Sequence, residues 1–186
     1  YYTTVSVLLI FLIPVLTMGV LAEERKRGTF ELLLTSPLTS TQIVVGKFIG
    51  IALVATLLVA MSLVFPLVLI LFSDPEVTPI IIGACGLLIL AWTFTALCVS
   101  VSAITTNQTF SALIGIVLLT VLCVVDLPAA RLGGNLAVVL NYLSPMQQVA
   151  NLLKGVIDAK NLIYFFSLIA LGLFVANRAL DAERWR

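Results

Sequence analysis

Long apolar runs separated by short polar breaks make up most of the chain. Five runs are long enough to cross a bilayer as helices, because about 20 apolar residues span its hydrocarbon core. The strands of a membrane barrel would alternate between apolar and polar residues, and these runs do not alternate. The pattern therefore predicts an all-α polytopic membrane protein with five transmembrane helices. The predicted spans cover residues 5–22, 43–72, 79–104, 110–125 and 162–179.

The break at residues 23–42 differs from the others because it carries much of the charge of the chain. It holds six of the 19 charged residues, and five of these form the run Glu23-Glu24-Arg25-Lys26-Arg27. One interpretation of such a run is a solvated, salt-bridged face. The other, which we favour, is a compact element between two spans that takes force or a signal from a partner.

Helix signals within this break support a compact element. Gly28 is expected to break the preceding helix, and Thr29 to cap a short helix over residues 30–35. Ser36-Pro37 should end that helix, because a residue before proline avoids the helical region. Thr39-Ser40-Thr41-Gln42 has the spacing of a capping box and should start the second span.

Residues 129–161 are too polar to form a simple span. Ser144-Pro145-Met146-Gln147 predicts a helix start, with a serine cap, proline at the first position and glutamine at the third. We expect a short segment over 136–143, followed by an amphipathic helix that lies at or dips into the interface. Such backbone is tolerated at membrane depth only where protein covers it.

The composition agrees with a membrane protein. Hydrophobic residues make up 61% of the 186 positions and charged residues 10%, against about 25% charged residues in soluble domains. The net charge of +1 gives no reason to expect a nucleic-acid partner. Histidine is absent, and Cys85, Cys98 and Cys123 lie in apolar runs, so we expect small buried hydrophobes and neither a metal site nor a disulfide.

Catalytic and ion-coupling chemistry is also missing. No phosphate-binding loop occurs, since Gly46-Lys47 is followed by Phe48, and we expect neither an enzyme nor a bound cofactor. The spans lack ionisable residues away from their ends, which argues against a proton- or sodium-driven carrier. Thr93 and Ser100 share a face of the third span and are candidate pathway residues. The favoured alternative is that their hydroxyls bond to the backbone within the helix packing.

The distribution of lysine and arginine predicts the orientation. With the spans alternating, seven basic residues fall on the side of residues 23–42 and three on the other side. Cytoplasmic loops carry an excess of Lys and Arg, so we expect the charged stretch and the C-terminus to be cytoplasmic. The seven are Arg25, Lys26, Arg27, Lys47, Arg178, Arg184 and Arg186, and the three are Arg131, Lys154 and Lys160.

Residues 21–38 and 43–48 resemble the signature of ABC-2 type ABC transporter permeases. The resemblance lies in the order of its parts: an acidic pair, a basic run, Gly28-Thr29, Glu31-Leu32-Leu33, Ser36-Pro37-Leu38 and Gly46-Lys47-Phe48. Leu143-Ser144-Pro145 and Lys154-Gly155-Val156-Ile157 are similar to the external segment of that family. In appearance the chain is closest to the gliding-motility-associated subgroup.

The resemblance implies a permease of six spans that pairs with a second permease and with two cytoplasmic ABC ATPase subunits, which bind ATP and Mg. It implies a location in the bacterial or archaeal plasma membrane, the cell inner membrane of some bacteria. In the family, the part matching 28–38 includes a coupling helix that docks on the ATPase, and the part matching 129–157 is an external re-entrant hairpin. The family normally has one further N-terminal span, so we expect upstream sequence to be missing.

We therefore expect the permease subunit of an exporter, which couples ATP hydrolysis on a separate subunit to substrate movement. The alternative is a non-transport membrane anchor or scaffold whose charged loop docks a partner. The residues expected to dock on the ATPase are Glu23, Glu24, Arg25, Arg27, Gly28, Thr29, Phe30, Glu31, Leu32, Leu33, Ser36 and Pro37.

Overall fold

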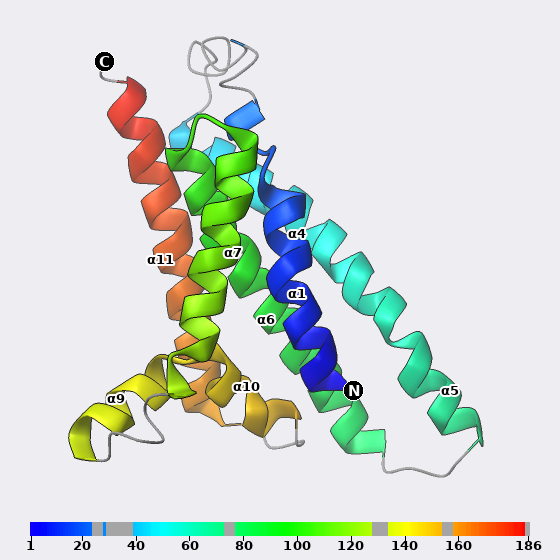
Figure 1. Ribbon diagram of the computed structural model, residues 1–186. Helices are drawn as coiled ribbons and strands as arrows, with labels where there is room; N and C mark the ends of the chain where they lie inside the picture. The colour runs from blue at the N-terminus through cyan, green and yellow to red at the C-terminus, as the bar shows by residue number, and fades with distance from the viewer. Residues whose placement is uncertain (24–27, 29–38, 73–76, 128–133, 154–157, 185–186) are drawn as a thin grey trace.

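The fold is a bundle of apolar helices, seen here in a computed structural model (Figure 1). The structure describes residues 1–23, 28, 39–72, 77–127, 134–153 and 158–184. These residues are almost all helical and contain no strand, which confirms the predicted all-α class. The helices are α1 (Tyr2–Thr17), α4 (Ser40–Ser62), α5 (Val64–Phe72), α6 (Val77–Ile104), α7 (Gln108–Val124), α9 (Gly134–Leu143), α10 (Pro145–Leu153) and α11 (Ala159–Arg184).

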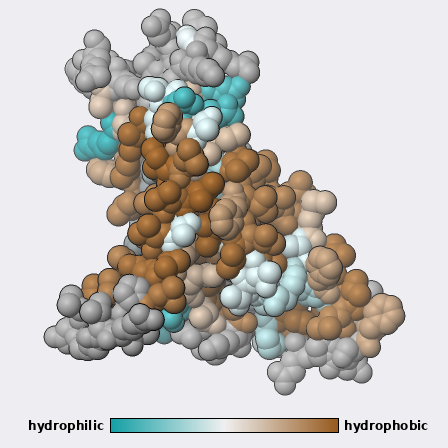
Figure 2. All heavy atoms as spheres, in the orientation of Figure 1, coloured by the Kyte–Doolittle hydropathy of each residue, from teal (hydrophilic) through white to brown (hydrophobic). Residues whose placement is uncertain are grey.

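Three helical segments in the described residues are long and apolar enough to cross a membrane: Ser40–Ile70, Val77–Ile104 and Ala159–Ala182. Helices α1 and α7 are shorter apolar helices. Large apolar side chains remain exposed along the apolar helices, such as Leu53 of α4 and Phe174 of α11, and Figure 2 shows a broad apolar surface across the middle of the bundle. Water-soluble monomers rarely expose apolar surface on this scale, so this surface fits a lipid environment.

Helix α6 is the centre of the bundle. It packs against α1, α4, α7, α10 and α11, and its residues 93–103 are all buried. Gly172 of α11 lets that helix approach closely, because a Cβ atom there would lie 2.7 Å from the carbonyl oxygen of Ala96. The main core brings Phe94 of α6 together with Phe165 of α11 and Val149 of α10.

The first predicted span is wrong at its end. Helix α1 stops at Thr17 instead of residue 22, and residues 18–21 form a turn in which the amide of Val20 donates to the carbonyl of Thr17 at 3.2 Å. Since Met18, Val20 and Leu21 are apolar, the hydropathy pattern did not show the turn. Gly19 was the one local signal, because glycine is common just beyond a helix end.

The second predicted span is split into α4 and α5 at Leu63. Pro66 explains the break, since proline has no amide hydrogen and its ring displaces the carbonyl four residues earlier. That carbonyl belongs to Ser62, and it accepts a hydrogen bond from the hydroxyl of Tyr1. Helix α5 then leans away from the rest of the bundle (Figure 1).

The predicted helix start at Pro145 is confirmed, but the capping contacts predicted for it are not formed. Ser144 Oγ is buried and has no hydrogen-bond partner in the structure. Gln147 Nε2 instead donates to Asp126 Oδ2 at 3.0 Å, and Gln148 Nε2 donates to the carbonyl of Tyr142 at 3.0 Å. Packing on α6 and these longer-range bonds therefore position α10.

The prediction that the cysteines are buried is confirmed for two of the three. Cys98 and Cys123 are buried, whereas Cys85 is exposed. Cys85 lies one residue before Gly86, which packs against Leu152 of α10, so the two residues face different sides of α6. An apolar run in a membrane protein has a lipid-facing side as well as a core side, and the sequence did not distinguish them.

Candidate coupling site

The candidate site is the segment between α1 and α4. Ten of the twelve predicted docking residues lie outside the described residues: Glu24, Arg25, Arg27, Thr29, Phe30, Glu31, Leu32, Leu33, Ser36 and Pro37. Glu23 is helical, and Gly28 has a φ of +71°, which favours glycine because that region is strained for other residues. The structure shows how the two ends of the segment are held.

The hydroxyl of Ser102 on α6 holds the beginning of the segment. Ser102 Oγ accepts hydrogen bonds from the amides of Leu21 at 3.2 Å and Ala22 at 3.3 Å. It also donates to the carbonyl of Met18 at 3.4 Å. One buried side chain thus bonds to three backbone groups of residues 18–22, which follow α1.

A capping box holds the end of the segment, as the sequence predicted. Thr39 Oγ1 accepts from the amide of Gln42 at 3.3 Å, and Gln42 Oε1 accepts from the amide of Thr39 at 3.0 Å. One residue into α4, Thr41 Oγ1 donates to Asn177 Oδ1 of α11 at 3.5 Å. The start of α4 is therefore fixed locally and tied to α11.

A second hydrophobic core joins these two ends, and we call it the end cluster. Leu21 from the turn packs there with residues of α4, α6 and α11. Both ends of the segment and the C-terminal part of α11 consequently lie at one end of the bundle, which we call the Glu23 end (Figure 1). The end cluster comprises Leu21, Ile43, Val44, Val99, Ala103, Ala176 and Leu180.

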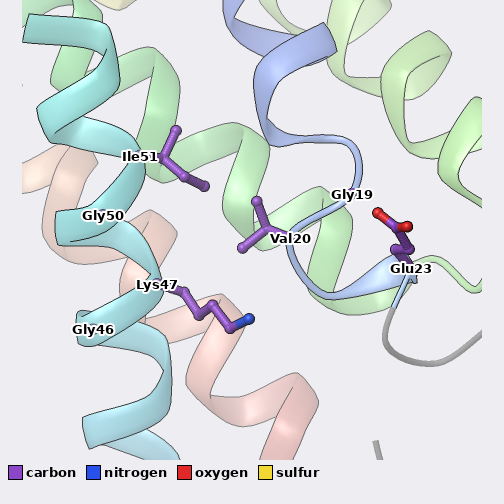
Figure 3. A pocket seen from close by; sticks show the side chains of 7 residues that line it. All are labelled: Gly19, Val20, Glu23, Gly46, Lys47, Gly50 and Ile51. Atoms are coloured by element: carbon purple, nitrogen blue, oxygen red, sulfur yellow. The ribbon is translucent and has the colours of Figure 1, made fainter. Parts of the chain in front are cut away.

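A cavity of about 490 Å³ lies beside this cluster, between the turn after α1 and the first half of α4. Glu23 comes from the turn side and Lys47 from α4, so the wall carries both signs of charge (Figure 3). Gly46 and Gly50 leave it open, since a Cβ atom on either would meet nothing within 4 Å. Lys47 belonged to the recognised signature, but the sequence did not predict a cavity here. Its lining is Gly19, Val20, Glu23, Gly46, Lys47, Gly50 and Ile51.

The two candidate pathway residues bond to their own helix. Thr93 Oγ1 donates to the carbonyl of Ile89 at 2.8 Å, and Ser100 Oγ donates to the carbonyl of Leu97 at 2.6 Å. Both side chains are buried in the chain. These bonds agree with the alternative that the hydroxyls bond to the backbone within the helix packing. A role in a substrate pathway stays a prediction. No group of three or more His, Cys, Asp or Glu that could hold a metal ion occurs within the described ranges.

The comparison with protein families adds the decisive observation. The sequence model of the ABC-2 family transporter protein matches residues 2–177, which is nearly the whole chain. The chain belongs to the ABC-2 transporter family. A search of curated proteins gives no match.

Membership implies a permease subunit of an ABC transporter and a multi-pass membrane protein. Permeases of this family normally work with an ABC ATPase, and they are transport subunits rather than catalytic ones. The resemblance seen in residues 21–48 is thereby confirmed at the level of the family. The match does not support the gliding-motility subgroup.

Proposed function

We propose that this ABC-2 permease couples ATP hydrolysis on a separate ATPase subunit to the export of a substrate, and that energy enters through residues 23–42. The family match over residues 2–177 carries the proposal and favours transport over a membrane anchor. The two ends of the segment support it, because Ser102 bonds one end to α6 and Thr41, within the capping box, bonds the other to α11. A segment held in this way passes displacement to its neighbours instead of absorbing it.

The side chains of the segment divide into two roles in docking. Glu23, Glu24, Arg25, Arg27 and Glu31 supply charge, which sets the register of an interface more than its affinity. The apolar residues Phe30, Leu32 and Leu33 supply an anchor, since binding interfaces are built around a central cluster of buried aromatic and aliphatic side chains. Gly28 and Ser36-Pro37 shape the backbone between them.

The proposed assembly has two copies of the ATPase subunit and a second permease, with ATP and Mg on the ATPases. The Glu23 end faces the cytoplasm in this proposal, because seven of the ten Lys and Arg residues fall on the side of residues 23–42 when the predicted spans alternate. The C-terminal part of α11 lies at the same end of the bundle, so the C-terminus is cytoplasmic too.

Charge reversal of the basic run tests the proposal. We expect Arg25→Glu combined with Arg27→Glu to abolish co-purification of the ATPase subunit, because two reversed charges would face like charges across the interface and repel the partner. Membrane insertion and abundance should stay near native levels. The control is Lys160→Glu, an exposed basic residue at the start of α11, away from the Glu23 end. Unchanged ATPase recruitment by the double variant would overturn the proposal.

A further inference from the structure

The hydroxyl of Ser102 differs from the other buried hydroxyls of α6 in what it bonds. Thr93, Thr95 and Ser100 donate to carbonyls three or four residues earlier in their own helix. All three hydrogen bonds given above for Ser102 reach instead across to residues 18–22, about 80 positions away in the chain. Ser102 therefore connects α6 to residues 18–22, whereas the other three hydroxyls bond within α6.

The groups in this contact are buried, so water cannot replace Ser102 as the partner of the two amides. Ser102, Leu21 and Ala22 have no exposed surface. Buried amides need an internal partner, and losing one leaves a costly unsatisfied group. Within the described residues, Ser102 is the partner that the structure gives to the amides of both Leu21 and Ala22.

The contact lies directly before the segment that we propose couples the ATPase to the permease. Ala22 is followed directly by Glu23, where the proposed docking segment begins. Leu21 inserts into the end cluster beside Val99 and Ala103, which flank Ser102 on α6. Helix α6 in turn contacts α1, α4, α7, α10 and α11, so a displacement that reaches Ser102 reaches the core of the bundle.

We propose that Ser102 is a positioning residue that transmits movement of the docking segment to α6. The hydroxyl ties the entry of the segment to the central helix, while the capping box at Thr39 ties its exit to α4. The segment thereby acts on two helices at once. This inference rests on the proposed function, because it assumes that the segment moves with an ATPase subunit.

The test uses the full chain with its co-purifying ATPase subunits in lipid nanodiscs, with and without ATP and vanadate. Site-resolved hydrogen exchange follows the amides of Leu21 and Ala22 and the nucleotide-dependent change along α6. Ser102→Ala should raise exchange of the two amides by about tenfold or more, since each loses a buried partner. It should also remove most of the difference in hydrogen exchange along α6 between the samples with and without ATP and vanadate. ATPase recruitment should be unchanged.

Two further variants separate coupling from a general loss of structure. Ser102→Thr keeps the hydroxyl and should restore both readouts. Ser100→Ala removes a hydroxyl that bonds within α6 and should alter neither. A full nucleotide-dependent change in Ser102→Ala, or failure of Ser102→Thr to restore it, would overturn the inference while leaving the proposed function standing. Absence of any ATPase subunit from the native preparation would instead overturn the proposed function, and the inference with it.

Discussion

At the scale of single residues, Gly172 decides how closely α11 can pack on α6. A Cβ atom at this position would lie 2.7 Å from Ala96 O and 2.8 Å from the carbonyl carbon of Ala96. Both are backbone atoms of a buried helix, so they cannot move aside as the end of a side chain could. Gly50 is the contrast, since a Cβ atom there would meet nothing within 4 Å.

We predict that alanine destabilises the chain at Gly172 but not at Gly50. Gly172→Ala should lower the stability of the purified chain by about 1–3 kcal/mol, because overpacking forces the helices apart. Gly50→Ala should be neutral or raise it by roughly 0.5–1 kcal/mol, because alanine restricts the unfolded backbone and favours helix. Thermal unfolding in detergent compares the two variants, and equal melting temperatures would contradict the close approach of α11 to α6.

Residue-level contacts were also what the sequence predicted least well. The capping box at Thr39 and Gln42 was predicted because its partners lie three positions apart and need no tertiary context. The bonds from Ser102 to Leu21 and Ala22 join residues about 80 positions apart, and no local sequence pattern predicts them. Ser144 shows the converse, because its sequence context favoured a cap and the folded chain leaves its hydroxyl unpartnered.

At the scale of elements, the start of α4 is the best-defined boundary of the candidate site. Thr39 and Gln42 exchange two hydrogen bonds there, and Ser40 is buried directly after the cap. The helix starts predicted from cap signals agree with the structure, as do the predicted ends at residues 72, 104 and 143, but the predicted end of the first span at residue 22 does not. Starts at Ser40 and Pro145 carry polar or proline signals, whereas α1 ends inside an apolar run.

Thr39→Ala should loosen the first turn of α4. Loss of an N-cap side chain costs about 1 kcal/mol of helix stability, which corresponds to several-fold faster hydrogen exchange in the first turn. Thr39→Ser keeps the accepting oxygen and should exchange at the native rate. Hydrogen exchange of the peptide that covers residues 39–45 is the measurement. Native protection in Thr39→Ala would show that contacts with α11, rather than the cap, hold this end of the segment.

At the scale of the whole molecule, the chain combines an apolar bundle with one charged segment held at both ends. The sequence predicted the all-α class and the family, because long apolar runs and an ordered signature are local properties. It did not predict that α6 would be the central helix. All spans are similarly apolar, and which of them is covered by the others depends on packing.

The central claim is that energy from an ATPase subunit enters at residues 23–42, and site-specific photocrosslinking tests it most directly. A photoreactive amino acid replaces Phe30 in the full chain, and as a control it replaces Val139, an exposed residue of α9 at the opposite end of the bundle. We predict that position 30 crosslinks to a subunit that binds ATP and that position 139 does not. If position 30 yields no such product while the variant inserts normally, or if position 139 yields as much of it, the claim is wrong.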